Sequence, residues 1–71
     1  MKYRKEREFV KKVNEELKEE VIVSRIIILE SGEKNGKVNS VLYEDRFGRE
    51  FEAYINAKGE YSKRELKNKR N

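Results

Sequence analysis

The chain has 71 residues, with 18 Lys and Arg against 14 Asp and Glu, a net charge of +4, and neither His nor Cys. A Ser–His or Cys–His nucleophile pair is therefore excluded, and so are disulfides and the usual zinc, haem and iron–sulfur sites. We expect a non-enzymatic protein with no cofactor, no metal and no small-molecule substrate. The Cys-free composition makes the cytoplasm the default location, and no apolar run approaches the length of a membrane span.

A single small α+β domain covering residues 1–71 is the expected organisation. The hydrophobic fraction of 35% and the charged fraction of 45% approach the composition of disordered chains. The apolar residues are clustered, however, and residues 21–29 alone hold seven aliphatic side chains in nine positions. This clustering favours a folded core.

An amphipathic helix is predicted over residues 4–20. Its apolar stripe would be made of side chains that fall within about 120° of one another at 100° per residue, namely Phe9, Val10, Val13, Leu17 and Val21. Four Glu residues crowd its C-terminal end, which is the reverse of what the helix dipole favours.

Three antiparallel strands are predicted to follow at residues 21–30, 37–44 and 49–56. Asn35-Gly36 is the strongest short hairpin signal, because both turn positions of a tight hairpin prefer positive φ. Asp45–Gly48 reads as a four-residue connection with Gly in the left-handed position. The predicted fold is therefore one N-terminal helix packed on a three-stranded antiparallel meander.

The C-terminal segment, residues 60–71, has two interpretations. Ser62 and Glu65 have the spacing of a capping box, which predicts a short basic C-terminal helix. The alternative is a short fourth strand at residues 60–62 followed by a basic tail.

The two turns also predict which side chains share a face of the sheet. They place Leu29 opposite Leu42, and Leu42 opposite Phe51. The side facing the helix would then contain Ile27, Leu29, Val38, Leu42, Phe51, Ala53 and Ile55. The opposite side would carry Ile26, Ile28, Val41, Tyr43 and Tyr54, flanked by Glu50 and Glu52. A bulge at Gly32 would exchange the faces of the first strand, but two of the four consecutive aliphatics at 26–29 point away from the helix in either register.

This uncovered face predicts a protein-binding module. Apolar and aromatic side chains with charges at the edge are typical of interface centres. The expected contact residues are Ile26, Ile28, Val41, Tyr43 and Tyr54, in a small regulator or inhibitor encoded by a phage or mobile element. Three occupants of the face are considered: the C-terminal segment folding back, a second copy in a homodimer, and a different protein.

A basic nucleic-acid-binding protein is the alternative. Clusters of Lys and Arg near both ends could contact phosphates, and Tyr3, Tyr43, Phe47 and Tyr54 could stack on bases. The candidate phosphate contacts are Lys2, Arg4, Lys5, Lys63, Arg64, Lys67 and Arg70.

Residues 38–66 resemble the C-terminal part of PepSY-like domains. Those domains have a helix followed by a meander whose last hairpin contains a Tyr-hydrophobic-Asp/Asn-Ala-Lys-x-Gly-Glu pattern. Residues 54–60 are similar to this pattern, with Asn56 in place of the common Asp and without the residue between Lys and Gly. The resemblance implies a non-catalytic domain that contacts proteins, with inhibitory roles proposed for the family. It implies no catalytic residues.

Overall fold

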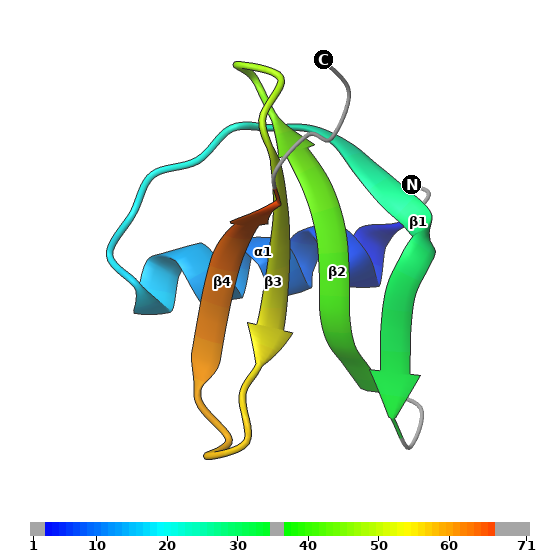
Figure 1. Cartoon of the computed structure of the whole chain (residues 1–71), viewed down its shortest axis with the longest axis vertical. Coiled ribbons are helices and arrows are strands. Elements are labelled where there is room, and N and C mark those ends of the chain that lie inside the picture. Colours follow the sequence, from blue (N-terminus) through cyan, green and yellow to red (C-terminus); the bar gives the residue numbers. More distant parts are fainter. Residues whose placement is uncertain (1–2, 35–36, 67–71) are drawn as a thin grey trace.

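In the computed structural model, one helix lies across one face of a four-stranded antiparallel sheet (Figure 1). The structure describes residues 3–34 and 37–66, and for residues 28–34 and 37 it describes the backbone alone. The predicted α+β class is confirmed, but the sheet has four strands rather than three. The elements in chain order are α1 (Arg4–Glu16), β1 (Val23–Lys34), β2 (Lys37–Asp45), β3 (Glu50–Ile55) and β4 (Tyr61–Leu66). The four strands follow the same order across the sheet.

Helix α1 ends at Glu16, four residues before the predicted boundary. Lys18 adopts a left-handed conformation with φ 60°. Its backbone N–H donates to the carbonyl of Glu15 at 3.1 Å, and the N–H of Glu19 donates to the carbonyl of Asn14 at 2.9 Å. These two bonds form a Schellman motif, which closes the helix without a glycine. Ending here keeps Glu19 and Glu20 out of a last turn in which the helix dipole would repel them.

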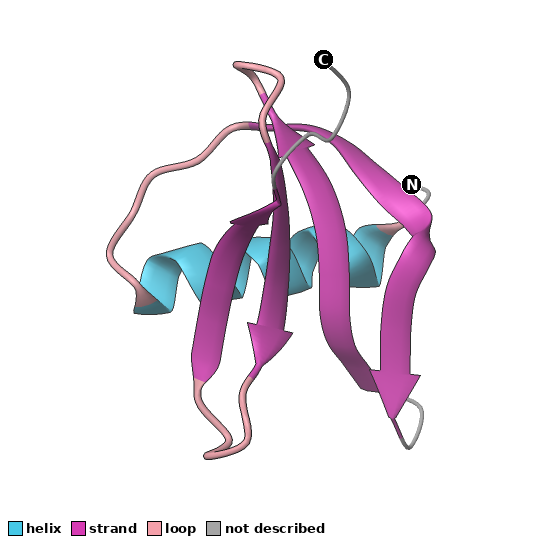
Figure 2. Cartoon of the chain, in the orientation of Figure 1, coloured by secondary structure: helices cyan, strands magenta, loops and turns pink. Residues whose placement is uncertain are grey.

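The core lies between α1 and the sheet face that it covers. Val10 and Val13 of the helix are fully buried, as the apolar stripe predicted. They pack against Ile26, Val41, Tyr43 and Ala53 of the sheet. Figure 2 shows that no helix within the described residues covers the opposite face of the sheet.

The connection between β2 and β3 is one residue shorter than predicted. The N–H of Asp45 donates to the carbonyl of Arg49 at 2.9 Å, so that only residues 46–48 form the loop. Gly48 has φ 81°, as a three-residue hairpin loop with a left-handed last position requires. The carboxylate of Asp45 tightens the loop further by accepting the N–H groups of Phe47 and Arg49 at 2.9 and 3.0 Å.

This one-residue change reverses the predicted faces of β2 over residues 41–43, whereas Val38, beyond an irregularity in the pairing with β1, packs against the core as predicted. Tyr43 pairs with Phe51 and Val41 with Ala53, whereas Leu42 was predicted opposite Phe51. Because the side-chain period of a strand is two, Val41 and Tyr43 now point toward the helix. The faces of β3 are as predicted.

Strand β1 confirms the predicted pairing at the turn and contradicts it further along. Lys34 pairs with Lys37, although residues 35–36 themselves lie outside the described residues. Between Ile27 and Gly32 the strand advances five positions while β2 advances two, so Ile27 rather than Leu29 pairs with Leu42. The three additional residues of β1 are accommodated by irregular pairing with β2 between Ile27 and Gly32.

Three of the predicted contact residues are consequently core residues. Ile26 is 8% exposed, and Val41 and Tyr43 have no exposed surface. Their assignment to an exposed face is wrong, because the observed pairing of β2 with β1 and with β3 differs from the predicted register. Tyr54 lies half-buried on the uncovered face as predicted, and the side chain of Ile28 lies outside the described residues.

The C-terminal segment forms a strand through Leu66 instead of a helix capped by Ser62. Ser62 pairs with Tyr54 along the edge of β3. A short helix with one interior apolar residue is marginal in water, whereas β4 gains a backbone ladder and packs the ring of Tyr61 edge-on against Phe9, with centroids 6.1 Å apart. The fourth strand considered at residues 60–62 is thus present and longer than predicted.

Candidate binding site at the β2–β3 turn

The uncovered sheet face is dominated by charges that pair with one another. Arg25 Nε lies 2.7 Å from Glu44 Oε1, and Arg64 Nε lies 2.8 Å from Glu52 Oε1. The hydroxyl of Ser40 also donates to Glu52, at 2.7 Å. Half-buried apolar side chains stand between these pairs, namely Ile27, Leu42, Tyr54 and Leu66. This is the mixed surface of an antiparallel sheet with one solvated face, not the apolar patch that the predicted register implied.

The predicted phosphate contacts do not gather on one surface within the described residues. Arg4 pairs with Glu8 at 3.3 Å near the start of α1, where Lys5 is exposed. Lys63 and Arg64 lie on β4, an edge strand, whereas the start of α1 lies near the opposite edge of the sheet in Figure 1. Lys2, Lys67 and Arg70 lie outside the described residues.

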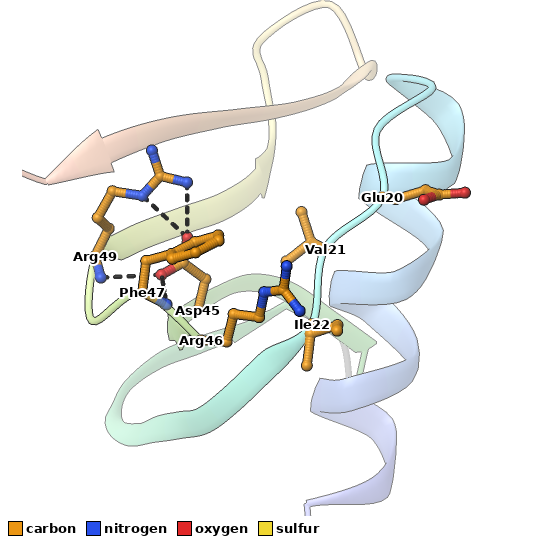
Figure 3. A pocket seen from close by; sticks show the side chains of 7 residues that line it. All are labelled: Glu20, Val21, Ile22, Asp45, Arg46, Phe47 and Arg49. Atoms are coloured by element: carbon orange, nitrogen blue, oxygen red, sulfur yellow. Dashed lines mark hydrogen bonds and ion pairs between the residues drawn. The ribbon is translucent and has the colours of Figure 1, made fainter.

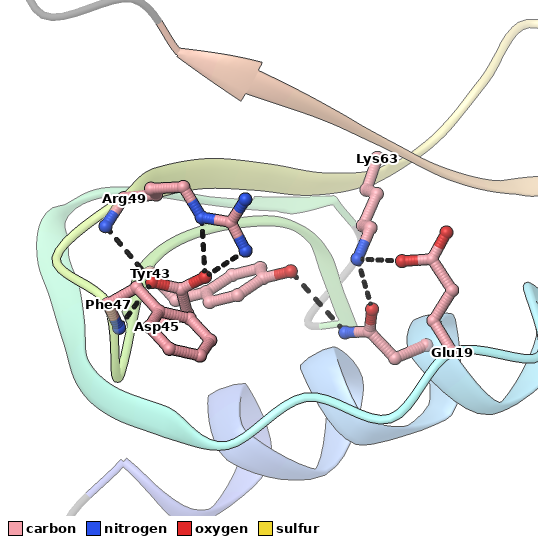
Figure 4. A network of polar contacts seen from close by, with 7 residues as sticks. Glu19, Tyr43, Asp45, Phe47, Arg49 and Lys63 are labelled. Atoms are coloured by element: carbon pink, nitrogen blue, oxygen red, sulfur yellow. Dashed lines mark hydrogen bonds and ion pairs between the residues drawn. The ribbon is translucent and has the colours of Figure 1, made fainter.

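Lys63 is instead part of an internal polar network (Figure 4). Its amine donates to Asn14 Oδ1 at 2.6 Å and lies 2.5 Å from Glu19 Oε1, and its side chain is only 11% exposed. The amide of buried Asn14 donates to the Val10 carbonyl at 2.9 Å and to the Tyr43 hydroxyl at 3.4 Å. The network joins α1, β2 and β4, so Lys63 stabilises the fold and is not available to a phosphate.

The β2–β3 turn is built around the carboxylate of Asp45, which is 5% exposed. Besides its two backbone bonds, the carboxylate accepts from Arg49 Nε at 3.1 Å and pairs with Arg49 Nη2 at 3.0 Å (Figure 3). Burial by itself raises the pKa of Asp45, but the hydrogen bonds from Arg49 and from the Phe47 N–H outweigh it, so the pKa lies below its ordinary value of 3.8.

We expect this carboxylate to make the domain less stable in acid. A group whose pKa is lowered by folding stabilises the folded state above its unfolded pKa, and this contribution is lost as pH falls through the folded pKa. Urea unfolding of the wild type and of Asp45→Asn should therefore differ most at neutral pH and converge toward pH 2, with Glu16→Gln, at an exposed position, as the control. A constant difference at all pH values would contradict the assignment.

A cavity of about 290 Å³ opens beside this turn (Figure 3). The segment between α1 and β1 forms one wall and the turn forms the other, and the N–H of Arg46 donates to the Ile22 carbonyl at 3.1 Å to hold the walls together. The two most exposed large apolar side chains of the described chain, Phe47 at 68% and Ile22 at 60%, both line this cavity. We name the surface formed by Val21, Ile22, Arg46 and Phe47 the turn patch.

Two guanidinium groups lie over the ring of Phe47. The Cζ atoms of Arg46 and Arg49 are 4.9 and 5.4 Å from its centroid. Arg49 is also held by Asp45, whereas no described carboxylate lies within ion-pair distance of Arg46. The patch therefore combines exposed apolar surface with one available cation.

The sequence reasoning missed Ile22 and Arg46 as site residues and considered Phe47 only as a base-stacking candidate. The available signal was an aromatic residue inside a turn, between Arg46 and Gly48, where no core can cover it. Ile22 gave no signal, because it falls in an apolar run that was predicted to be a strand.

No described helix is both long and apolar enough to cross a membrane. Within residues 3–34 and 37–66, no three acidic side chains gather in a way that could hold a metal ion. No protein-family model matches the chain, and no curated protein or solved structure does so either. The resemblance to PepSY-like domains therefore stays a prediction from the sequence.

Proposed function

We propose that the chain is a small non-enzymatic protein-binding module that contacts its partner through the turn patch. The proposed role is that of a regulator or inhibitor acting in the cytoplasm, as the size and composition of the chain predict. The contact surface differs from the one predicted, because Ile26, Val41 and Tyr43 of the predicted surface are buried in the core.

The observation that carries this proposal is the exposure of Phe47 and Ile22 on one cavity. Single exposed apolar side chains are common on soluble proteins, but adjoining ones beside a hollow and a cation have the composition of an interface centre. Aromatic and Arg side chains are also the residue types that contribute most to protein–protein binding.

The patch is held rigidly enough to bind without a large ordering cost. The Asp45 carboxylate makes two backbone hydrogen bonds within the turn, and the bond from Arg46 to Ile22 ties the turn to the other wall. Preorganised surfaces lose less conformational entropy on association, and more of the contact energy then appears as affinity.

A test of this proposal needs a variant that removes the apolar surface and keeps the fold. Random peptides displayed on phage would be selected on the immobilised wild type, and the recovered peptides measured on Ile22→Ser/Phe47→Ser. We expect affinity to fall by about tenfold or more on this double variant. Tyr54→Ser, which changes an aromatic side chain on the uncovered sheet face, is the matched control and should bind as the wild type does.

Three results would contradict the proposal. They are the recovery of no binder, binders indifferent to the double variant, and binders that lose affinity on Tyr54→Ser instead. Far-UV circular dichroism of each variant checks the fold.

A further inference from the structure

We infer that the cavity beside the turn binds a carboxylate side chain of an acidic, partly apolar peptide segment, and that Arg46 is the residue that selects it. This inference rests on the proposed function and names the class of partner. It begins from a difference between the three arginines at this end of the sheet. Arg25 is paired with Glu44 and Arg49 with Asp45, whereas Arg46 has no described carboxylate within 4.0 Å.

The position of Arg46 beside Phe47 suits such a ligand. The Cζ atom of Arg46 lies 4.9 Å from the centroid of the Phe47 ring, within the distance of a cation–π contact. The N–H donors of a guanidinium form a planar fork that can make two parallel bonds to a carboxylate. Figure 3 shows the Arg46 side chain directed toward Val21 and Ile22, across the hollow.

The apolar walls specify what must accompany the carboxylate. Val21, Ile22 and the ring of Phe47 offer aliphatic and aromatic contact on both sides of Arg46. A cavity of about 290 Å³ is at the small end of ligand pockets, so it suits one or two side chains of a peptide better than a large cofactor. An acidic residue next to a Leu or Phe fits this combination.

The surrounding charges favour an acidic peptide over a nucleic acid. A nucleic-acid strand presents a phosphate at each nucleotide and needs a track of cations. Among the described residues that line the cavity, Arg46 is the single cation without a carboxylate partner. Asp45 and Glu20 also line the cavity, with the Glu20 side chain directed away from Arg46 in Figure 3. These carboxylates tolerate one isolated anion that Arg46 binds directly, but they would repel a chain of phosphates.

The inference can be tested by nuclear magnetic resonance with defined probes. Two blocked tripeptides, acetyl-Leu-Glu-Phe-amide and acetyl-Leu-Gln-Phe-amide, would be titrated into the isotope-labelled protein. The Glu peptide should shift the amide signals of Val21, Ile22 and Phe47 and the Nε–H signal of Arg46 in a saturable manner. The Gln peptide should bind about tenfold more weakly, because it loses the charge-assisted bonds.

Variants of the protein complete the test. Arg46→Gln should remove the preference for Glu, and Arg46→Lys should retain only part of it, because Lys cannot form the planar two-point contact. Arg4→Gln, which removes one positive charge elsewhere, is the matched control and should behave as the wild type. A single-stranded thymidine oligonucleotide should produce no saturable shift at these positions.

The outcomes separate this inference from the proposed function. Phage peptides that need Phe47 and Ile22 but bind Arg46→Gln equally well would overturn the carboxylate and leave the protein-binding function in place. Tight binding of the oligonucleotide at Arg46 would overturn the acidic peptide in favour of nucleic acid. Failure of the Ile22→Ser/Phe47→Ser variant to change any binding would overturn the proposed function itself.

Discussion

Replacing Tyr43 by Ala should remove a large part of the stability of this domain. The Tyr43 side chain has no exposed surface, and its ring stacks on Phe51 with centroids 5.6 Å apart and planes 18° apart. Truncation of a buried aromatic side chain to Ala costs about 3–5 kcal/mol of unfolding free energy. A 71-residue domain has a total of only about 4–10 kcal/mol available, so the loss amounts to about a third of the total or more.

Two variants show whether the ring or the hydroxyl is responsible. Tyr43→Phe keeps the ring and removes the hydroxyl that accepts from Asn14, so we expect a loss of about 1 kcal/mol. Tyr54→Ala removes an aromatic side chain from the uncovered face and should cost about 1 kcal/mol or less. Urea unfolding followed by far-UV circular dichroism measures all three. A Tyr43→Ala variant as stable as Tyr54→Ala would contradict the burial of Tyr43 and favour the register predicted from the sequence, in which both residues lie on the uncovered face.

The wrong face for Tyr43 has an identifiable cause in the sequence. The α+β class, the helix stripe and the hairpin order follow from apolar periodicity and from turn residues, and these were predictable. The register between β2 and β3 depends on whether the loop contains three or four residues. That choice is made by the Asp45 carboxylate, whose bonds to the backbone of Phe47 and Arg49 close the shorter loop.

The candidate site was less predictable than the fold for a related reason. Phe47 is exposed because the short loop ends the strand pairing at Asp45, and Ile22 is exposed because β1 begins only at Val23. Both boundaries depend on tertiary hydrogen bonds, among them the bond from Arg46 to the Ile22 carbonyl. Apolar periodicity alone carries no information about such bonds.

Breaking the polar network of Asn14 and Lys63 from either side should also destabilise the domain strongly. Asn14→Leu removes the hydrogen-bond acceptor of the largely buried Lys63 amine and leaves it with Glu19 and the ring of Phe51, and we expect a loss of about 2–3 kcal/mol. Lys63→Met leaves the Asn14 carbonyl oxygen buried without its donor and should cost about 1–3 kcal/mol. Urea unfolding of the two single variants and of the double variant measures the coupling between them.

The double variant Asn14→Leu/Lys63→Met should regain most of the lost stability. Replacing both partners of the Asn14–Lys63 pair by apolar side chains leaves neither of these two groups unsatisfied, whereas either single change does. The double variant still loses the long 3.4 Å bond from Asn14 to the Tyr43 hydroxyl, as Asn14→Leu does alone. The exposed pair of Arg64 with Glu52 supplies the control cycle, because Arg64 is adjacent to Lys63 in the chain and its side chain is 65% exposed. Its coupling should stay below about 1 kcal/mol. Equal couplings in the two cycles would contradict the importance given to burial.

The same double variant should reveal what the network contributes besides stability. Neither face of β4 has a continuous apolar row, since Tyr61, Lys63 and Glu65 alternate with Ser62, Arg64 and Leu66. Burial alone therefore specifies the register of this edge strand weakly. Lys63 can reach Asn14 in only one register, and we expect hydrogen exchange of the β4 amides to accelerate in the double variant even where its unfolding free energy matches the wild type. Unchanged protection of β4 would show that the backbone ladder to β3 sets the register without the network.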